Sequence, residues 1–324
     1  MMELTEKLEP IILLSAIGIG LISSKIAFLS ENTGNLINLF LCLMLYALFL
    51  EVPLKDLKKS FKNIKFTATS LIINFIWTPL FGYFLGNLFL NGNMDIFIGF
   101  FLLILTPCTD WYLIFTKMGK GDLTLSLSIL PLNLILQIIL LPVYLILFFS
   151  SNNMIIYTDL LYSLVIMIVI PFSLAQITKL LLNNDLNEKI TSVLSKYQIV
   201  FLALAVFAIF NSKGLLLFEN LEPTLTIFIP LIIFFASNCI IDLLLSEQIN
   251  FTYEEYVSLT MTTLARNSPL ALAIAVNAFP GRELIAIALV VGPLIELPVL
   301  YLVSKFVLKI KNSGLFFVCG FNFD

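Results

Sequence analysis

The sequence contains no histidine and very little charge: charged residues make up 12% of its 324 residues, and hydrophobic residues make up 60%. The commonest general base and metal ligand is therefore missing. The four cysteines have neither the spacing of a zinc site nor that of a disulfide framework. No paired-carboxylate or Ser/Lys signature suggests an enzyme, and no basic cluster suggests nucleic acid. We therefore expect no enzyme, no cofactor, no metal and no nucleic-acid partner.

Long apolar stretches fill the chain instead. A helix needs about 20 apolar residues to cross a bilayer, and ten such segments lie between the charged connections. They fall at about 10–29, 34–50, 66–90, 95–116, 123–149, 159–178, 198–218, 223–245, 256–279 and 284–304. The predicted fold class is an all-α polytopic membrane protein, a single membrane domain over 1–324 whose partner is the lipid bilayer. The polar stretches between segments are too short to form a separate soluble domain.

Basic residues concentrate on one side of these segments. With the N-terminus in the cytoplasm, fourteen of the 18 Lys and Arg residues fall in cytoplasmic connections or tails. Lys25, Lys213 and Arg282 fall outside, and Arg266 falls within a segment. This asymmetry predicts a multi-pass protein of the cell membrane with both termini cytoplasmic.

Ten segments divide as five plus five, and an odd number in each half gives the two halves opposite orientations. In helix four, Pro107 precedes Gly121 by fourteen residues, and in helix nine, Asn267 precedes Gly281 by the same spacing. We therefore predict two inverted five-helix repeats with broken, crossing helices four and nine. The repeats would cover about 10–149 and 159–304.

Each of these two helices is interrupted by proline and polar residues, TPCTD at 106–110 and RNSP at 266–269. Proline removes a backbone donor, and the groups it frees persist in a membrane only beside protein or a wet cavity. Each proline taken alone also fits an ordinary kink. Two breaks at matching positions indicate a transport site where they cross.

Ionisable side chains accompany both breaks, Asp110 in one and Arg266 in the other. Charged groups inside a membrane usually serve function, so we expect these two to form a pair, with a purely structural salt bridge as the alternative. Asn133 and Gln137 share one face of helix five and either line the cavity or bond a neighbouring helix. The candidate substrate- and ion-binding residues are Pro107, Cys108, Thr109, Asp110, Asn133, Gln137, Arg266, Asn267, Ser268 and Glu296.

Cys108 follows the helix-breaking proline directly. A buried cysteine usually behaves as a small hydrophobic residue. A thiolate is also a soft ligand that suits thiophilic solutes such as trivalent arsenic. Its place within the break favours the second interpretation.

These motifs resemble the bile acid:sodium symporter superfamily, including its arsenical-resistance (arsenite efflux) branch. The stretch MGKGD after helix four resembles that superfamily's turn, and NSPLALAIA from Asn267 resembles the symporters' NSGLAAALA. The stretch ALVVGPLIELPV from Ala288 resembles the corresponding run of the arsenite branch. The resemblance puts Cys108 where arsenite efflux proteins carry their essential cysteine, and Pro107 where the symporters carry a proline.

The chain departs from this superfamily at several ligand positions. Tyr112 and Leu113 stand where the symporters have a sodium-binding Ser-Asn pair, and Thr262 stands where they have a sodium-binding glutamate. Pro269 replaces a glutamate of the arsenite branch, and Arg266 replaces a symporter glutamine. By this comparison the fixed cation of the arginine would substitute for sodium.

Together these features predict a secondary transporter, most simply a proton-coupled exporter of arsenite or a related small solute. In it, Asp110 would be the group that takes up the coupling proton, with Glu296 as the next candidate. The alternative is a sodium- or proton-coupled symporter of organic anions, with Arg266 binding the carboxylate. Cys108 favours the exporter, and the missing helix-nine glutamate favours the symporter.

Overall fold

The computed structural model describes residues 4–26, 32–52, 61–109, 111–149, 162–163, 165–219 and 224–313. Within these ranges the regular elements are helices, together with one isolated β-bridge. Six helical runs are long and apolar enough to cross a membrane: Gly34–Glu51, Ile64–Phe89, Leu123–Phe149, Asp185–Lys213, Phe228–Ile249 and Glu283–Lys311. Shorter apolar helices are Ile11–Ser23, Met94–Leu105, Val165–Leu181 and Ser268–Ala278. The prediction of an all-helical, multi-pass membrane protein is confirmed.

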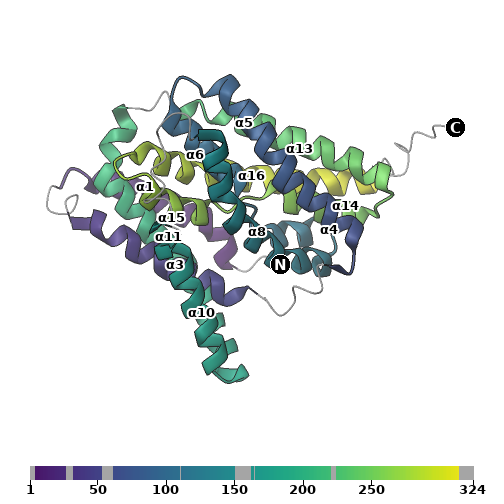
Figure 1. The fold of residues 1–324 in the computed structure, drawn as a ribbon, viewed down its shortest axis with the longest axis horizontal. Coiled ribbons are helices and arrows are strands. Elements are labelled where there is room, and N and C mark those ends of the chain that lie inside the picture. The colour runs from purple at the N-terminus through teal and green to yellow at the C-terminus, as the bar shows by residue number, and fades with distance from the viewer. Residues whose placement is uncertain are drawn as a thin grey trace.

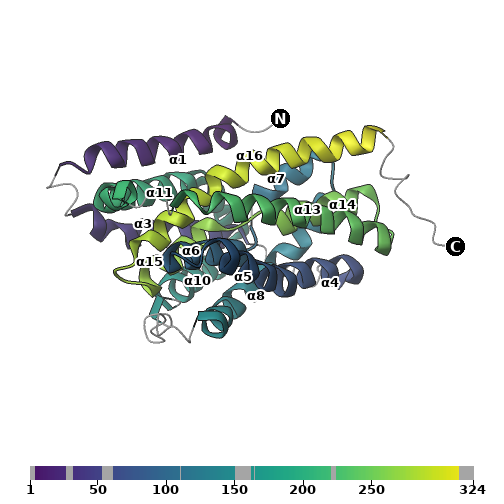
Figure 2. The same ribbon diagram turned by 90° about the horizontal axis from the view of Figure 1, so that it is seen from above.

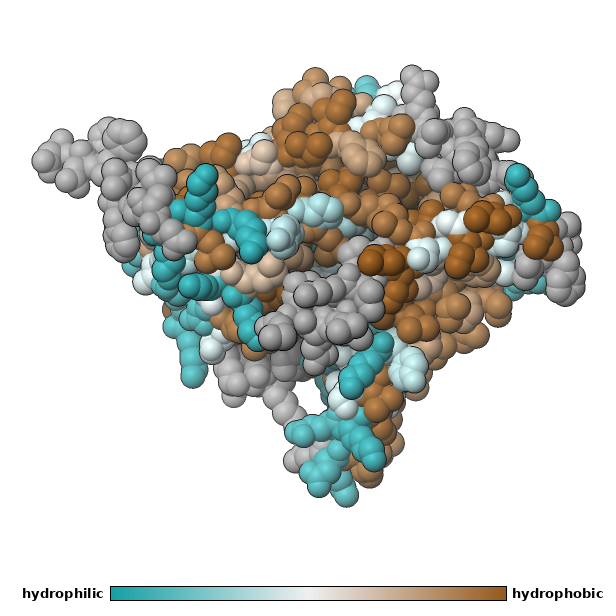
Figure 3. Space-filling view, turned by 180° about the vertical axis from the view of Figure 1, so that it is seen from behind, coloured by the Kyte–Doolittle hydropathy of each residue, from teal (hydrophilic) through white to brown (hydrophobic). Residues whose placement is uncertain are grey.

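The surface agrees with this conclusion. Hydrophobic side chains cover much of the face shown in Figure 3, and hydrophilic ones gather toward one side and at the tip of the lower projection. Many large apolar side chains on the helices are exposed, as expected where lipid rather than water surrounds a protein.

Four helices form a first helix group in which each packs against at least one of the others. They are α1 (Leu4–Ser23), α3 (Ile37–Glu51), α10 (Ile170–Leu181) and α11 (Asn184–Glu219). In Figure 2, α1, α3 and α11 lie together at one end of the molecule. The sequence segments that build this group come from the beginning and the middle of the chain.

The remaining helices form a second helix group around α6 and α16. They are α4 (Ile64–Ile72), α5 (Thr78–Phe89), α6 (Met94–Leu105), α7 (Trp111–Met118), α8 (Leu123–Phe149), α13 (Phe228–Ile249), α14 (Tyr253–Leu264), α15 (Ser268–Ala278) and α16 (Glu283–Ser313). The two groups meet where α16 packs against α11 and where α15 packs against α3. The candidate functional site lies at this junction.

Two helices extend well past their predicted ends. α11 begins at Asn184 rather than near residue 198, so the polar stretch predicted as a connection is helical. Ile190 and Leu194, one turn apart, pack against the hydrophobic core there, while Lys189 is exposed. α16 likewise continues to Ser313. An apolar run marks the part of a helix that lipid surrounds and does not mark where the helix ends.

The helix before α11 extends beyond the rest of the molecule at one end. Figure 1 shows α10 projecting downward from the other helices.

Close packing of α5 on α6 depends on two glycines four residues apart. A Cβ atom added to Gly82 would overlap Ile104, and one added to Gly86 would overlap Phe97. Small residues at this spacing let two membrane helices approach closely. The contact fixes α6, which leads directly into the first helix break.

Gly86→Ala is expected to lower the thermal unfolding midpoint of the purified protein. An added methyl group in a filled contact typically costs about 1–3 kcal/mol, because the Phe97 ring must move. Gly92→Ala is the matched control, since an added Cβ there meets nothing within contact distance. Scanning fluorimetry of both variants checks this result, and equal midpoints would contradict the packing argument.

Candidate functional site

Both predicted helix breaks are present. α6 ends at Leu105 and α14 ends at Leu264, and the residues that follow, Thr106 and Ala265, have extended backbone. The proline at 107 explains the first break, because the residue before a proline is disfavoured in helical conformation. The chain becomes helical again at α7 and at α15.

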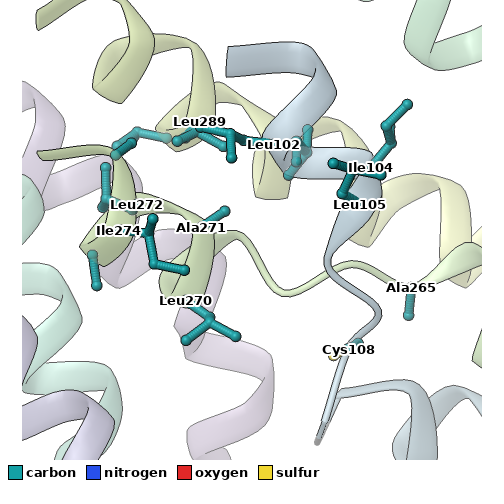
Figure 4. Close-up of a cluster of buried hydrophobic side chains, with 14 of the residues drawn as sticks. Leu102, Ile104, Leu105, Cys108, Ala265, Leu270, Ala271, Leu272, Ile274 and Leu289 are labelled. Carbon is teal, nitrogen blue, oxygen red and sulfur yellow. The ribbon is translucent and has the colours of Figure 1, made fainter. Parts of the chain in front are cut away.

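The two breaks lie against each other through their backbones. Pro107 and Arg266 form an antiparallel β-bridge, and the Cys108 N–H donates to the Ala265 carbonyl at 3.0 Å. In Figure 4 the segment that carries Cys108 passes beside the segment that connects Ala265 to Leu270. The predicted meeting of the interrupted helices is therefore confirmed, and it satisfies backbone groups that the breaks release.

Asn267 joins the two break segments through further hydrogen bonds. Its N–H donates to the Thr106 carbonyl at 2.6 Å, and the Thr106 hydroxyl donates to the Asn267 carbonyl at 3.1 Å. The side-chain oxygen of Asn267 caps α15 by accepting from the Leu270 N–H at 3.1 Å. Its amide nitrogen donates to the Thr109 hydroxyl at 3.2 Å. These bonds give Asn267 a structural role in the crossing.

The Arg266 guanidinium lies at the ends of both interrupted helices. Nη1 donates to the Ile104 carbonyl at 2.8 Å, and Nη2 donates to the Thr263 carbonyl. These carbonyls belong to the last turns of α6 and α14, where a helix has unsatisfied acceptors and a partial negative charge. The guanidinium also lies 4.9 Å from the centre of the Phe234 ring. One buried cation therefore caps two helices.

Glu296 supports the same residue from α16. Its carboxylate accepts the backbone N–H of Arg266 at 2.7 Å, and its side chain is buried. It lies between Pro293 and Pro298, both inside α16. A carboxylate from a third helix is thus fixed to the crossing.

A pocket of about 370 Å³ lies beside the crossing, between the two helix groups. The second group contributes the break residues, α7 and α16, and the first group contributes α3 and α11. Its lining residues are Leu48, Glu51, Cys108, Trp111, Leu113, Ile114, Ser195, Lys196, Gln198, Ile199, Leu202, Arg266, Asn267, Ser268, Pro269, Pro293 and Glu296. The pocket is large enough for a small solute, and about half of its lining residues are polar or charged.

Cys108 contributes a thiol to the lining of this pocket. It is 4% exposed, and it lines the pocket beside Arg266, Asn267 and Ser268. A neighbouring cavity of about 210 Å³ is lined by Thr109 and shares Leu48, Glu51 and Leu113 with the larger pocket. The site therefore offers one soft sulfur ligand among apolar, hydrogen-bonding and charged side chains.

The structure does not place three of the predicted site residues at this pocket. Asp110 lies outside the described residues. Asn133 and Gln137 are buried on α8, and neither lines the pocket described above. In the part of the chain that the structure describes, their amide atoms have no hydrogen-bond partner, so neither predicted use of these residues is observed.

Sequence reasoning overlooked Asp242, a fully buried carboxylate on α13. Its Oδ2 accepts the Thr263 hydroxyl at 2.6 Å, and Thr263 in turn holds the Arg266 guanidinium through its carbonyl. The signal was available: an aspartate interrupts an apolar run, with Asn238 four residues before it and Ser246 four residues after it. A charge inside a membrane segment is by itself a reason to expect function.

A family model described as "Sodium Bile acid symporter family" matches residues 38–220. The chain is 23% identical over 281 residues to the Arsenical-resistance protein Acr3 of Corynebacterium glutamicum, covering 82% of this chain and 75% of that protein. It is 26% identical over 249 residues to the uncharacterized protein YbaS of Bacillus subtilis, covering 74% and 79%. It is 24% identical over 299 residues to the uncharacterized transporter slr0944 of Synechocystis sp., covering 85% and 78%.

Proposed function

Because the chain belongs to the sodium bile acid symporter family, we propose that it is a secondary transporter that exports arsenite or a related small solute in exchange for protons. The observation that carries the proposal is the position of Cys108 on the wall of the pocket beside the crossing. A relative that covers most of the chain is an arsenical-resistance protein. Trivalent arsenic binds sulfur, so the thiol supplies a ligand of the right chemistry.

The arrangement around Arg266 favours a small uncharged solute over an organic anion. Two guanidinium nitrogens donate to the Ile104 and Thr263 carbonyls, and the plane lies near Phe234. A carboxylate that bound this group would have to replace hydrogen bonds that close two helix ends. Recognition through the pocket's thiol and hydrogen-bonding groups requires no such rearrangement.

The same contacts support transport that does not depend on sodium. Arg266 places a permanent positive charge at the negative ends of α6 and α14, where a bound cation would have the same effect. Tyr112 donates its hydroxyl to the Ser126 carbonyl at 2.6 Å, and Thr262 donates to the Ser258 carbonyl at 2.7 Å. At these two positions the resemblance would place sodium ligands, and this chain instead has hydroxyls bonded within the protein.

We further propose ten membrane spans in two inverted repeats, with both termini cytoplasmic. Each half of the chain sends its first helices, α1 and α3 or α10 and α11, to the first helix group and its later helices to the second. Glu51 and Lys196, which line the pocket, fall on the cytoplasmic side in this topology. The pocket would then take up solute from the cytoplasm, as an exporter requires.

Transport into proteoliposomes tests this proposal. The purified full-length protein should move arsenite under an imposed proton gradient, and a sodium gradient alone should have no effect. An organic anion such as taurocholate should not be moved under either gradient. Sodium-driven uptake of the anion without arsenite movement would replace the proposal by the symporter alternative.

The topology gives its own prediction in intact cells. A membrane-impermeant maleimide should label Asn91→Cys, in the turn after α5, from outside. It should label Lys189→Cys, near the start of α11, only after permeabilisation, because that position is cytoplasmic in the proposed orientation. Both residues are exposed, so access to the reagent depends on the side of the membrane. The unsubstituted protein is the control. Labelling of Lys189→Cys in intact cells would show that the protein has the opposite orientation.

A further inference from the structure

A second set of buried polar side chains lies away from the pocket, between α13 and the helical run of α4 and α5. Each helix contributes three residues spaced by four, so each set lies along one face of its helix. We call these six residues the polar seam: Ser70, Asn74 and Thr78, with Asn238, Asp242 and Ser246. All six are fully buried, and each has a side-chain nitrogen or oxygen without a hydrogen-bond partner among the described residues.

The two halves of the seam face each other. The Trp77 indole N–H donates to the Asn238 side-chain oxygen at 2.9 Å, and the Phe66 and Phe251 ring centres lie 6.3 Å apart. The helices are therefore antiparallel. Figure 1 shows α13 alongside the run of α4 and α5.

From this register, Asn74 and Asp242 lie at nearly the same level. Asn74 lies less than one turn along its helix from Trp77, and Asp242 lies about one turn along α13 from Asn238, in the same direction. A π-helical turn, η3 (Ile73–Trp77), contains Asn74. Such turns occur frequently at functional sites, and this one lies opposite the only carboxylate among the six seam residues.

Asp242 has asymmetric surroundings. Oδ2 accepts the Thr263 hydroxyl at 2.6 Å, whereas Oδ1 has no hydrogen-bond partner in the described part of the chain. The charged or titratable groups close enough to interact with it electrostatically are Cys239 on α13, Tyr256 on α14 and Arg266 at the second break. Native proteins pair nearly all buried polar groups, so a bare carboxylate oxygen requires an explanation.

We propose that Asp242 is the carboxyl group that binds and releases the coupling proton, in place of Asp110 or Glu296. This inference rests on the proposed transport function. The amides and hydroxyls of the seam can both donate and accept hydrogen bonds, so they suit a carboxylate and a neutral acid equally. A seam with one carboxylate and several such groups fits a proton and the water molecules that deliver it.

Thr263 connects this group to the solute pocket. Its hydroxyl has two acceptors, the Asp242 carboxylate at 2.6 Å and the Thr260 carbonyl at 3.2 Å. Its carbonyl accepts from Arg266, which lines the pocket. When Oδ2 is protonated, it donates a hydrogen bond to the Thr263 hydroxyl. That hydroxyl then donates its own hydrogen to the Thr260 carbonyl instead. Thr263 is thus a positioning residue. Protonation of Asp242 changes the hydrogen bond of its hydroxyl, and its carbonyl holds Arg266 at the helix ends of the crossing.

Infrared difference spectroscopy of the purified full chain in liposomes, recorded as pH is stepped, tests the proton site without any solute. Among the titrating C=O stretching bands of protonated carboxylic acids, the unsubstituted protein should show one component that Asp242→Asn lacks. Asp110→Asn and Glu247→Gln, the latter a carboxylate on the same helix outside the seam, should keep that component. Titrating bands unchanged in Asp242→Asn overturn the assignment, as does displacement of that component by sodium at constant pH.

Thr263→Val keeps the side-chain shape and provides a second test if Asp242→Asn does not fold. Loss of the hydrogen bond to Oδ2 should move the midpoint of the band to higher pH by about one unit, equivalent to about 1.4 kcal/mol. An unmoved midpoint overturns the role of Thr263 and the assignment of the band to Asp242. A titrating band in a protein that moves neither arsenite nor anions would reject the proposed function and leave the proton site standing.

Discussion

Cys108→Ser is expected to reduce arsenite flux in proteoliposomes about tenfold or more while leaving the amount of folded protein unchanged. Serine has nearly the same size as cysteine, so the pocket keeps its shape. Its hydroxyl is a hard oxygen ligand, and trivalent arsenic prefers sulfur. The backbone N–H at this position donates to the Ala265 carbonyl, a bond that the substitution does not touch. The measurement is the initial rate of arsenite movement under a fixed proton gradient.

Cys42→Ser is the matched control for this prediction. Cys42 is a partly buried cysteine on α3, and it does not line the pocket. Its replacement should leave arsenite flux unchanged. Normal flux in Cys108→Ser would remove the thiol from the mechanism, and the solute would then have to be one that the pocket recognises through its hydrogen-bonding groups.

The crossing of the two helix breaks could be located from sequence because its strongest signals are local. Proline and polar residues within apolar runs predict broken membrane helices, since lipid does not tolerate freed backbone groups. Both breaks occur where Pro107 and Asn267 indicated, and their backbones meet. The spacing of the breaks was enough to predict their meeting without any knowledge of packing.

What could not be predicted depends on the direction in which side chains point. The sequence shows that Arg266 is charged, but only the packed helices show that its guanidinium faces the carbonyls of Ile104 and Thr263. In the same way, the shared face of Asn133 and Gln137 did not reveal that neither residue lines the pocket. Asp242 has no helix break beside it, and its hydrogen-bond partner Thr263 lies on a different helix, so only the packed structure connects it to the crossing.

Arg266→Gln is expected to destabilise the protein strongly, by about 3–5 kcal/mol, the range for removing one partner from a buried charged cluster. The two helix-end carbonyls lose charged donors, and Glu296 remains buried beside the crossing. Arg266→Gln combined with Glu296→Gln should recover part of this loss, because no uncompensated charge is then left behind. A double-mutant cycle of unfolding midpoints measures the coupling.

Arg282→Gln provides the comparison that makes this result specific. Arg282 pairs with Asp95 at a partly exposed position beside the start of α6, where such a pair contributes about 0–1 kcal/mol. Its loss should therefore shift the midpoint much less than the loss of Arg266. If both arginine variants shift it equally, the capping of α6 and α14 by Arg266 contributes little stability. Strictly additive effects of Arg266→Gln and Glu296→Gln would show that the two charges do not act together. A large coupling would instead show that the two charges stabilise the crossing together, as expected if Arg266 takes the place of a bound cation in the proposed transporter.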